Sequence, residues 1–158
     1  NRVGVGEELG EGRRGVGSEP CATSIWGVDR DEYLRRADPW PLNPDGELLL
    51  GLTIESAAAI PRIEEILSVP GIGFAEMGPG DLSLSLGYFR LPRPLPPGME
   101  EVRERVRAAC LANGVAFLEG ATPEDVQEKI DAGARVFSGH REDTARAGRE
   151  YTKREMPA

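Results

Sequence analysis

The stretch LLLGLTIESAAAIPRIEEILSVPGIGFAEMGPGD, residues 48–81, decides the fold. Residues 48–55 form a continuous apolar run, which is typical of a strand buried on both faces. Residues 56–67 carry apolar side chains at helical spacing, with Pro61 in the first turns. Residues 71–78 form a second apolar run. This order predicts a strand, a helix and a second strand parallel to the first.

The same alternation continues to the end of the chain. Gly114 is placed to close a helix in the left-handed conformation, and Thr122 is placed to cap the next helix at its N-terminus. The pattern predicts helices over 99–112, 122–133 and 142–153 and strands over 115–120 and 134–140. The chain therefore holds four strand–helix units of an α/β fold with parallel strands. A complete eight-unit barrel needs about 250 residues, so four units make a partial (β/α)8 TIM barrel.

The chain divides in its composition near residue 47. Residues 1–47 are rich in Gly and Pro, and we expect them to be irregular apart from a short helix over 29–37. Asp29 is a suitable N-cap for that helix. Residues 48–158 are expected to form the half-barrel domain.

Composition and charge exclude several classes of function. The 158 residues are 39% hydrophobic and carry a net charge of −8, so we expect one globular domain that does not bind nucleic acid. The longest apolar run, Leu48 to Ile54, is too short to span a membrane. The two cysteines, Cys21 and Cys110, lie far apart and predict buried, reduced thiols in a cytoplasmic protein.

Polar residues stand where the predicted strands end. They are Glu55, the turn 78–81, Glu119 and His140. Side chains at the carboxyl ends of parallel strands face the ligand site. Three carboxylates at one mouth repel one another unless a divalent cation such as Mg²⁺ or Mn²⁺ neutralises them. Backbone amides of the 78–81 turn, at a helix N-terminus, suit a substrate carboxylate.

Each of these residues also has a purely structural interpretation. Glu55 suits pairing with an arginine or a backbone amide, and Asp81 suits the N-cap of a helix over 82–86. Glu119 suits a loop hydrogen-bond acceptor, and His140 suits either a base or a surface position without a catalytic task. The residues alone leave these alternatives open.

The ordered set LGLTIESAAAIPRIEEILSVPGIGFAEMGPGDLSLSLGY, residues 50–88, resembles the HpcH/HpaI aldolase and citrate lyase family. The likeness is nearest to its 2-keto-3-deoxy-acid (4-hydroxy-2-oxo-acid) aldolase branch. It rests on a strand ending in Ile-Glu, then Val-Pro-Gly-Ile and Gly-Pro-x-Asp-Leu-Ser, and it extends through 117–133 and 139–148. The resemblance implies the last four units of the barrel, with Glu55 and Asp81 as the metal ligands.

The resemblance also implies a reaction. Family members of this branch cleave a 4-hydroxy-2-oxo acid reversibly to pyruvate and an aldehyde, with Mg²⁺ or Mn²⁺ bound and Co²⁺ as a further candidate. Gly78, Pro79, Gly80 and Asp81 then correspond to the substrate-binding turn. The family's His-Asp base pair and its substrate-holding arginine belong to an N-terminal segment without a counterpart here, so the catalytic residues are unknown. Thr53 stands where relatives often have Gln.

Two other functions remain open at this point. One is a citrate-lyase or malyl-CoA-lyase type of carbon–carbon lyase, which shares both metal ligands. The other is a non-catalytic, truncated half-barrel. The lyase alternative would use a CoA thioester. For the aldolase we expect a small 2-oxo-acid substrate, no membrane partner and a homo-oligomer formed through the C-terminal helix, 142–153.

Overall fold

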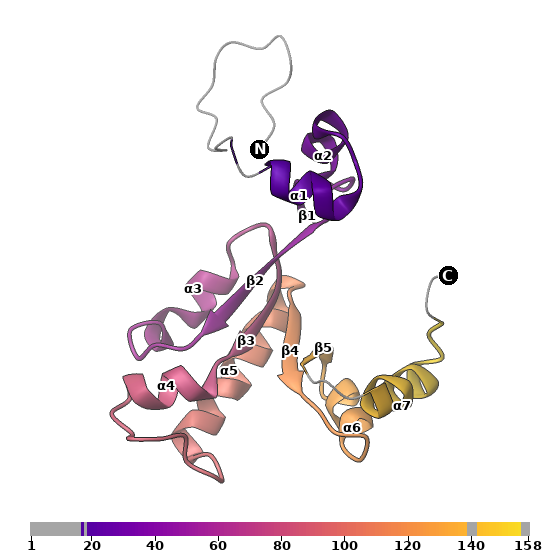
Figure 1. Ribbon diagram of the computed structural model, residues 1–158. Helices are drawn as coiled ribbons and strands as arrows, with labels where there is room; N and C mark the ends of the chain where they lie inside the picture. Colours follow the sequence, from indigo (N-terminus) through magenta and orange to yellow (C-terminus); the bar gives the residue numbers. More distant parts are fainter. Residues whose placement is uncertain (1–16, 18, 139–141, 156–158) are drawn as a thin grey trace. The chain divides into compact units, whose positions relative to one another are not determined.

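A computed structural model describes residue 17, residues 19–138 and residues 142–155, and its elements are labelled in Figure 1. Five parallel strands are hydrogen-bonded in the order β1-β2-β3-β4-β5. The strands are β1 (Pro39–Trp40), β2 (Leu48–Ile54), β3 (Ile72–Met77), β4 (Ala116–Gly120) and β5 (Ala134–Ser138). The helices are α1 (Glu19–Trp26), α2 (Arg30–Arg36), α3 (Ile63–Leu67), α4 (Pro79–Ser85), α5 (Pro97–Asn113), α6 (Val126–Asp131) and α7 (Glu142–Thr152), with a 3-10 turn, η1, at Ile60–Arg62.

The predicted α/β class and the parallel strands are confirmed. β2, β3, β4 and β5 each fall within the four predicted strands, and each is followed by helical structure, as a partial barrel requires. No helix in the described parts of the chain is long and apolar enough to cross a membrane. The chain clusters into two compact units, one of residues 1–50 with 70–73 and one of residues 51–69 with 74–158.

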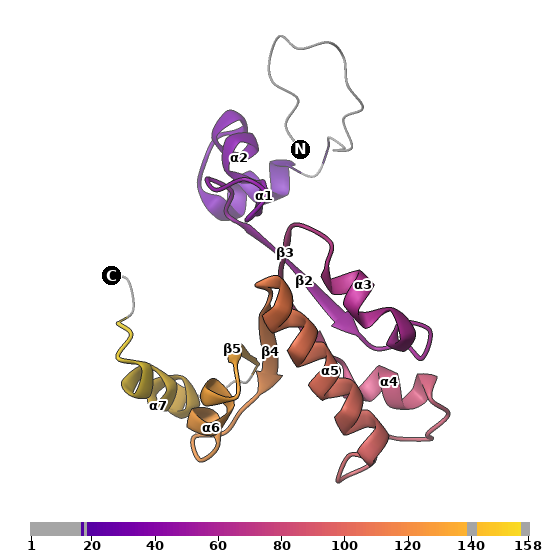
Figure 2. The ribbon, with the colours of Figure 1, turned by 180° about the vertical axis from the view of Figure 1, so that it is seen from behind.

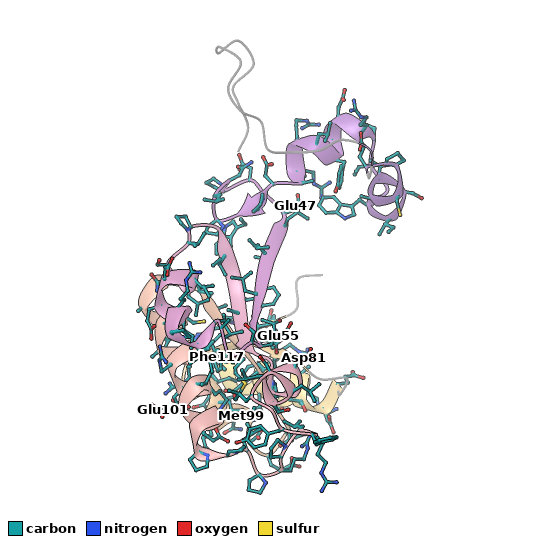
Figure 3. All side chains as sticks on the ribbon, turned by 90° about the vertical axis from the view of Figure 1, so that its left-hand side faces the viewer. Glu47, Glu55, Asp81, Met99, Glu101 and Phe117 are labelled. Atoms are coloured by element: carbon teal, nitrogen blue, oxygen red, sulfur yellow. The ribbon has the colours of Figure 1, made fainter. Side chains whose placement is uncertain are left out.

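The first unit is held together by short helices and ion pairs. Asp29 caps α2 as predicted, since its carboxylate accepts the backbone N–H of Glu32 at 2.8 Å. The ring of Trp26, on α1, packs edge-on against a tyrosine of α2, and the Arg36 guanidinium lies 5.4 Å from the Trp26 ring centroid. Arg36 also forms two hydrogen bonds of 2.6 Å with Glu47, which is labelled in Figure 3.

The second unit has its core where α5 packs on the strands. Figures 1 and 2 together show α5 lying against one side of β3 and β4. Phe117 of β4 is 1% exposed, and Val106 and Cys110, four residues apart on α5, are fully buried. The helix ends at Gly114, whose φ of 67° is the left-handed conformation predicted for it.

Two predicted helices are shorter than expected. Only Ile63–Leu67 of the segment 56–67 is α-helical, because Pro61 lacks an N–H and falls in the preceding 3-10 turn. Thr122 is not an N-cap, which corrects the prediction. Its N–H is instead bound by the Asp125 carboxylate at 2.6 Å, which folds residues 122–125 into a turn and delays α6 to Val126.

The two cysteines differ in environment, which corrects the prediction of two buried thiols. Cys110 is buried in α5, where burial raises its pKa to about 11. Cys21 is exposed on α1, and the sequence pattern did not predict this helix.

Candidate metal centre

The neighbouring strands β2 and β3 bring matching residues onto one face, in layers. A Cβ built on Gly51 would lie 2.2 Å from the ring of Phe74, so these two positions oppose each other. Two residues further along each strand, the Thr53 hydroxyl lies 3.4 Å from a carboxylate oxygen of Glu76. Since side chains alternate along a strand, the next layer on this face holds Glu55 and Gly78. We call the side that carries Thr53, Glu55 and Glu76 the carboxylate face.

Gly78 is required by the close approach of the two strands. Its N–H donates to the carbonyl of Ile54 at 3.0 Å. A Cβ at this position would lie 2.6 Å from the Thr53 methyl carbon and 3.0 Å from the Glu55 carboxylate oxygen Oε2. The carboxylate of Glu55 therefore lies directly over Gly78, the residue that caps the next helix.

Asp81 follows in the first turn of α4. The helix is capped by Gly78 and starts with Pro79, whose ring fixes a helical φ and whose missing N–H costs nothing there. The alternative role of Asp81 as N-cap is therefore wrong, because the helix begins two residues earlier and has no side-chain cap. Figure 3 shows Glu55 and Asp81 at the same end of the strands, consistent with the contact of Glu55 to Gly78.

A hydrogen bond ties the two carboxylate-bearing segments together. The backbone N–H of Ala57, two residues after Glu55, donates to the Ser85 hydroxyl at 2.9 Å. Ser85 is the last residue of α4, the helix that carries Asp81. The bonds at the two ends of the segment, Gly78 to Ile54 and Ala57 to Ser85, fix α4 against the end of β2.

The two carboxylates suit a hard divalent cation. Neither the Glu55 nor the Asp81 side chain has a hydrogen bond or an ion pair with any described residue, and both residues are exposed. Within the described ranges, no three His, Cys, Asp or Glu side chains are grouped closely enough to hold one ion. Proteins commonly bind Mg²⁺ through two carboxylates and leave the other coordination positions of the ion to water and substrate. The donor set fits the metal that the sequence predicts.

Glu119 does not join these carboxylates, which corrects the predicted convergence of three acids. Burial raises the pKa of its carboxyl group, and the charges of Lys129 and Arg103, on α6 and α5, act in the opposite direction. The charged groups that act on its pKa belong to α5, to α6 and to the turn before α6, and Glu119 lies two residues after the buried Phe117 on the same face of β4. Alternation along the strand gives it that direction. His140 lies outside the described residues.

Glu76 is the residue of this face that sequence reasoning missed. It is the single charged residue in the run 71–78 and stands two positions before Gly78, so it shares the face of Gly78. The period of two was a usable signal, but residues 71–78 were interpreted as one apolar strand without a comparison of its two faces.

A hollow of about 660 Å³ lies elsewhere, between α6, β5 and α7. Its lining includes Phe137, the buried Thr144 and a single carboxylate, that of Glu155. Among the predicted site residues that the structure describes, none lines this hollow, and one carboxylate is a poor donor set for a divalent cation.

Comparison with known proteins identifies relatives of this chain. The model of the HpcH/HpaI aldolase/citrate lyase family matches residues 8–141. A 2-keto-3-deoxy-L-rhamnonate aldolase of Escherichia coli K12 is 35% identical over a region that covers 80% of this chain and 44% of that protein. The chain thus spans less than half the length of this relative.

Solved structures show the same fold. An HpcH/HpaI aldolase from Desulfitobacterium hafniense DCB-2 aligns with a TM-score of 0.56 and 28% identity, covering 92% of this chain and 55% of that one. The β subunit of citrate lyase from M. tuberculosis, solved with oxaloacetate and magnesium, aligns with a TM-score of 0.54 and 18% identity, covering 65% and 51%.

Proposed function

Because the chain belongs to the HpcH/HpaI aldolase/citrate lyase family, we propose that it forms the metal-holding part of a divalent-metal-dependent aldolase. The reaction is cleavage of a 4-hydroxy-2-oxo acid to pyruvate and an aldehyde. The observation that carries the proposal is the pair Glu55 and Asp81. Both lie at one end of the strands, on segments tied to each other, and neither has a partner among the described residues.

Each part of the site has a separate task in this proposal. Glu55 and Asp81 supply oxygen ligands to Mg²⁺ or Mn²⁺, with Co²⁺ as a further candidate. When bound, the cation supplies Lewis-acid stabilisation of negative charge on the 2-oxo oxygen, an effect worth several kcal/mol.

The first turn of α4 provides for the substrate carboxylate. The N–H groups of Gly80 and Asp81 have no partner four residues earlier in the helix, as at any helix start, and we assign the carboxylate to them. Gly78 contributes space rather than a donor, because its N–H is bound to Ile54. Pro79 has no N–H and contributes the turn.

The proton of the 4-hydroxyl group needs a base. When the bond between C3 and C4 breaks, that proton leaves as the aldehyde carbonyl forms, and the electron pair moves to the pyruvate fragment. We assign no residue of this chain to the base.

A 2-keto-3-deoxy acid is the favoured substrate class because the E. coli relative of that name is 35% identical. The citrate-lyase alternative has support at the level of the fold only, at 18% identity. Release of pyruvate from a 4-hydroxy-2-oxo acid, measured beside cleavage of a malyl thioester, separates the two. We also propose that the protein forms a homo-oligomer through α7. In this chain the Tyr151 hydroxyl of α7 donates to Asp131 of α6 at 2.8 Å.

The metal ligands are tested by titrating the protein with Mn²⁺ and counting bound ions by electron paramagnetic resonance. We expect one site in the parent chain and its loss in both Glu55→Gln and Asp81→Asn, since each substitution removes an anionic oxygen ligand without changing side-chain size. Glu101→Gln is the matched control, because Glu101 is an exposed acid on α5 (Figure 3) without a partner among the described residues. Unchanged Mn²⁺ binding in Glu55→Gln would refute the proposed function.

A further inference from the structure

The carboxylate face holds a third acid for which the proposed site has no role. Glu76 is half-buried on β3, one layer before Glu55 and Gly78. Two residues along a strand span about 6.5 Å, so its carboxylate lies near the ligand layer without belonging to it. The described residues contain no group of three acids able to hold one ion, so Glu55, Asp81 and Glu76 do not all ligate the same cation.

Thr53 determines where the Glu76 carboxylate lies. Its methyl carbon lies 2.6 Å from the position that a Cβ of Gly78 would take, so the methyl group occupies the space that the glycine leaves open. A β-branched side chain has few χ1 choices. With the methyl group against Gly78, the Thr53 hydroxyl points to Glu76 and donates to its Oε1 at 3.4 Å.

The charge of Glu76 has no counterion in the described parts of the chain. Its recorded hydrogen bond comes from a neutral hydroxyl, whereas acids on the helix surfaces often have an arginine, as Glu64 has Arg105 at 3.0 Å. A half-buried carboxylate without a positive partner is unfavourable. Together with Glu55 and with Asp81 of α4, it brings three negative charges to this end of the strands, one more than a divalent cation neutralises.

We infer that Glu76 is an outer carboxylate of the metal site, oriented by Thr53, that strengthens cation binding without ligating the ion. This inference rests on the proposed function, because it needs a cation at Glu55 and Asp81. The excess negative charge retains the cation when a neutral water or a weakly bound substrate is its other ligand. Groups just outside the ligand set commonly change metal affinity by 10–100-fold.

The test is the Mn²⁺ dissociation constant of four variants of the protein, measured by the same titration. Glu76→Gln keeps the size of the side chain and an acceptor for Thr53 but removes the charge. We expect Mn²⁺ to bind about tenfold more weakly to it, at the low end of the effect of such groups. Glu76→Asp keeps the charge and is expected to retain most of the affinity. Glu101→Gln is the control for net charge, and Glu55→Gln abolishes binding.

The outcomes separate this inference from the function on which it rests. If Glu55→Gln binds Mn²⁺ as the parent does, the proposed function fails. If Glu55→Gln loses Mn²⁺ while Glu76→Gln matches Glu101→Gln, only the inference is overturned. Equal weakening in Glu76→Gln and Glu76→Asp also overturns it, because packing rather than charge would then be responsible.

A fifth variant covers the case in which the Glu76 substitutions fail to fold, as judged by far-ultraviolet circular dichroism. Thr53→Val keeps the branched shape against Gly78 and removes the hydroxyl that orients Glu76. We expect a smaller loss of Mn²⁺ affinity than in Glu76→Gln. Parent-like affinity in a folded Thr53→Val would count against the orienting role.

Discussion

Replacing Gly78 by alanine tests the geometry of the site with a single methyl group. The φ of Gly78 is −82°, which alanine adopts without strain, so any effect comes from contacts. The new carbon would lie 2.6 Å from the Thr53 methyl carbon, 3.0 Å from Glu55 Oε2 and 3.1 Å from Glu55 Cβ.

The size of the effect follows from these distances. Carbon atoms pack best at about 3.5–4.0 Å, so the methyl group is roughly 1 Å too close to Thr53. Overpacking of this kind costs about 1–3 kcal/mol of unfolding free energy. With a urea dependence of about 1–3 kcal/mol per molar, the unfolding midpoint should fall by roughly 1 M. Because Glu55 must also move, Mn²⁺ binding should weaken with stability.

Urea unfolding followed by far-ultraviolet circular dichroism measures the change, and two further variants sharpen it. Gly80→Ala adds the same methyl group two residues later, where nothing lies within 4 Å, so we expect it to be neutral or stabilising by up to about 1 kcal/mol. Adding Thr53→Ser to Gly78→Ala removes the nearest carbon and should recover part of the loss. Equal midpoints for Gly78→Ala and Gly80→Ala would refute the placement of Glu55 and Thr53 over Gly78.

Two further predictions concern titration. Burial raises the pKa of Glu119, so the folded chain binds this proton more readily than the unfolded chain, and its contribution to stability is present at low pH and lost as pH rises through the folded pKa. Glu119→Gln should therefore raise the melting temperature at neutral pH and change it little near about pH 4. An unchanged melting temperature at neutral pH would contradict burial as the main cause of the raised pKa. A thiol reagent at mildly alkaline pH should label Cys21 in the folded chain and reach Cys110 only after unfolding. The reason is that burial raises the pKa of Cys110 to about 11. Labelling of both thiols in the folded chain would show that α5 is not packed as described.

Local signals predicted the fold where one residue type determines the backbone. Gly114 and Asp29 were predicted as caps and act as caps, because a left-handed residue and a side-chain acceptor leave few alternatives. Thr122 failed because Asp125 competes for its backbone N–H, and a sequence pattern does not rank two such local bonds. Helix α1 was missed, since its eight residues, Glu19–Trp26, show no strong apolar stripe.

The site was predictable in part for a related reason. Glu55 and Asp81 follow from the rule that strand ends carry ligand-binding side chains, together with the family motif. Glu119 obeys the same rule by position but points to the helices, and only the alternation along β4 decides this. The opposition of Thr53 and Glu76 depends on the register between two strands, which the order of residues in one strand does not contain.

The location of the two tryptophans has a practical consequence for experiments on this protein. Trp26 and Trp40 both belong to the unit of residues 1–50 with 70–73, and Trp26 is in contact with Tyr33 and Arg36 there. Tryptophan fluorescence therefore reports on that unit, which includes the start of β2, where Leu49 pairs with Trp40. An unchanged tryptophan emission spectrum on adding Mn²⁺ is the expected result for an ion bound at Glu55 and Asp81, because both residues belong to the other unit.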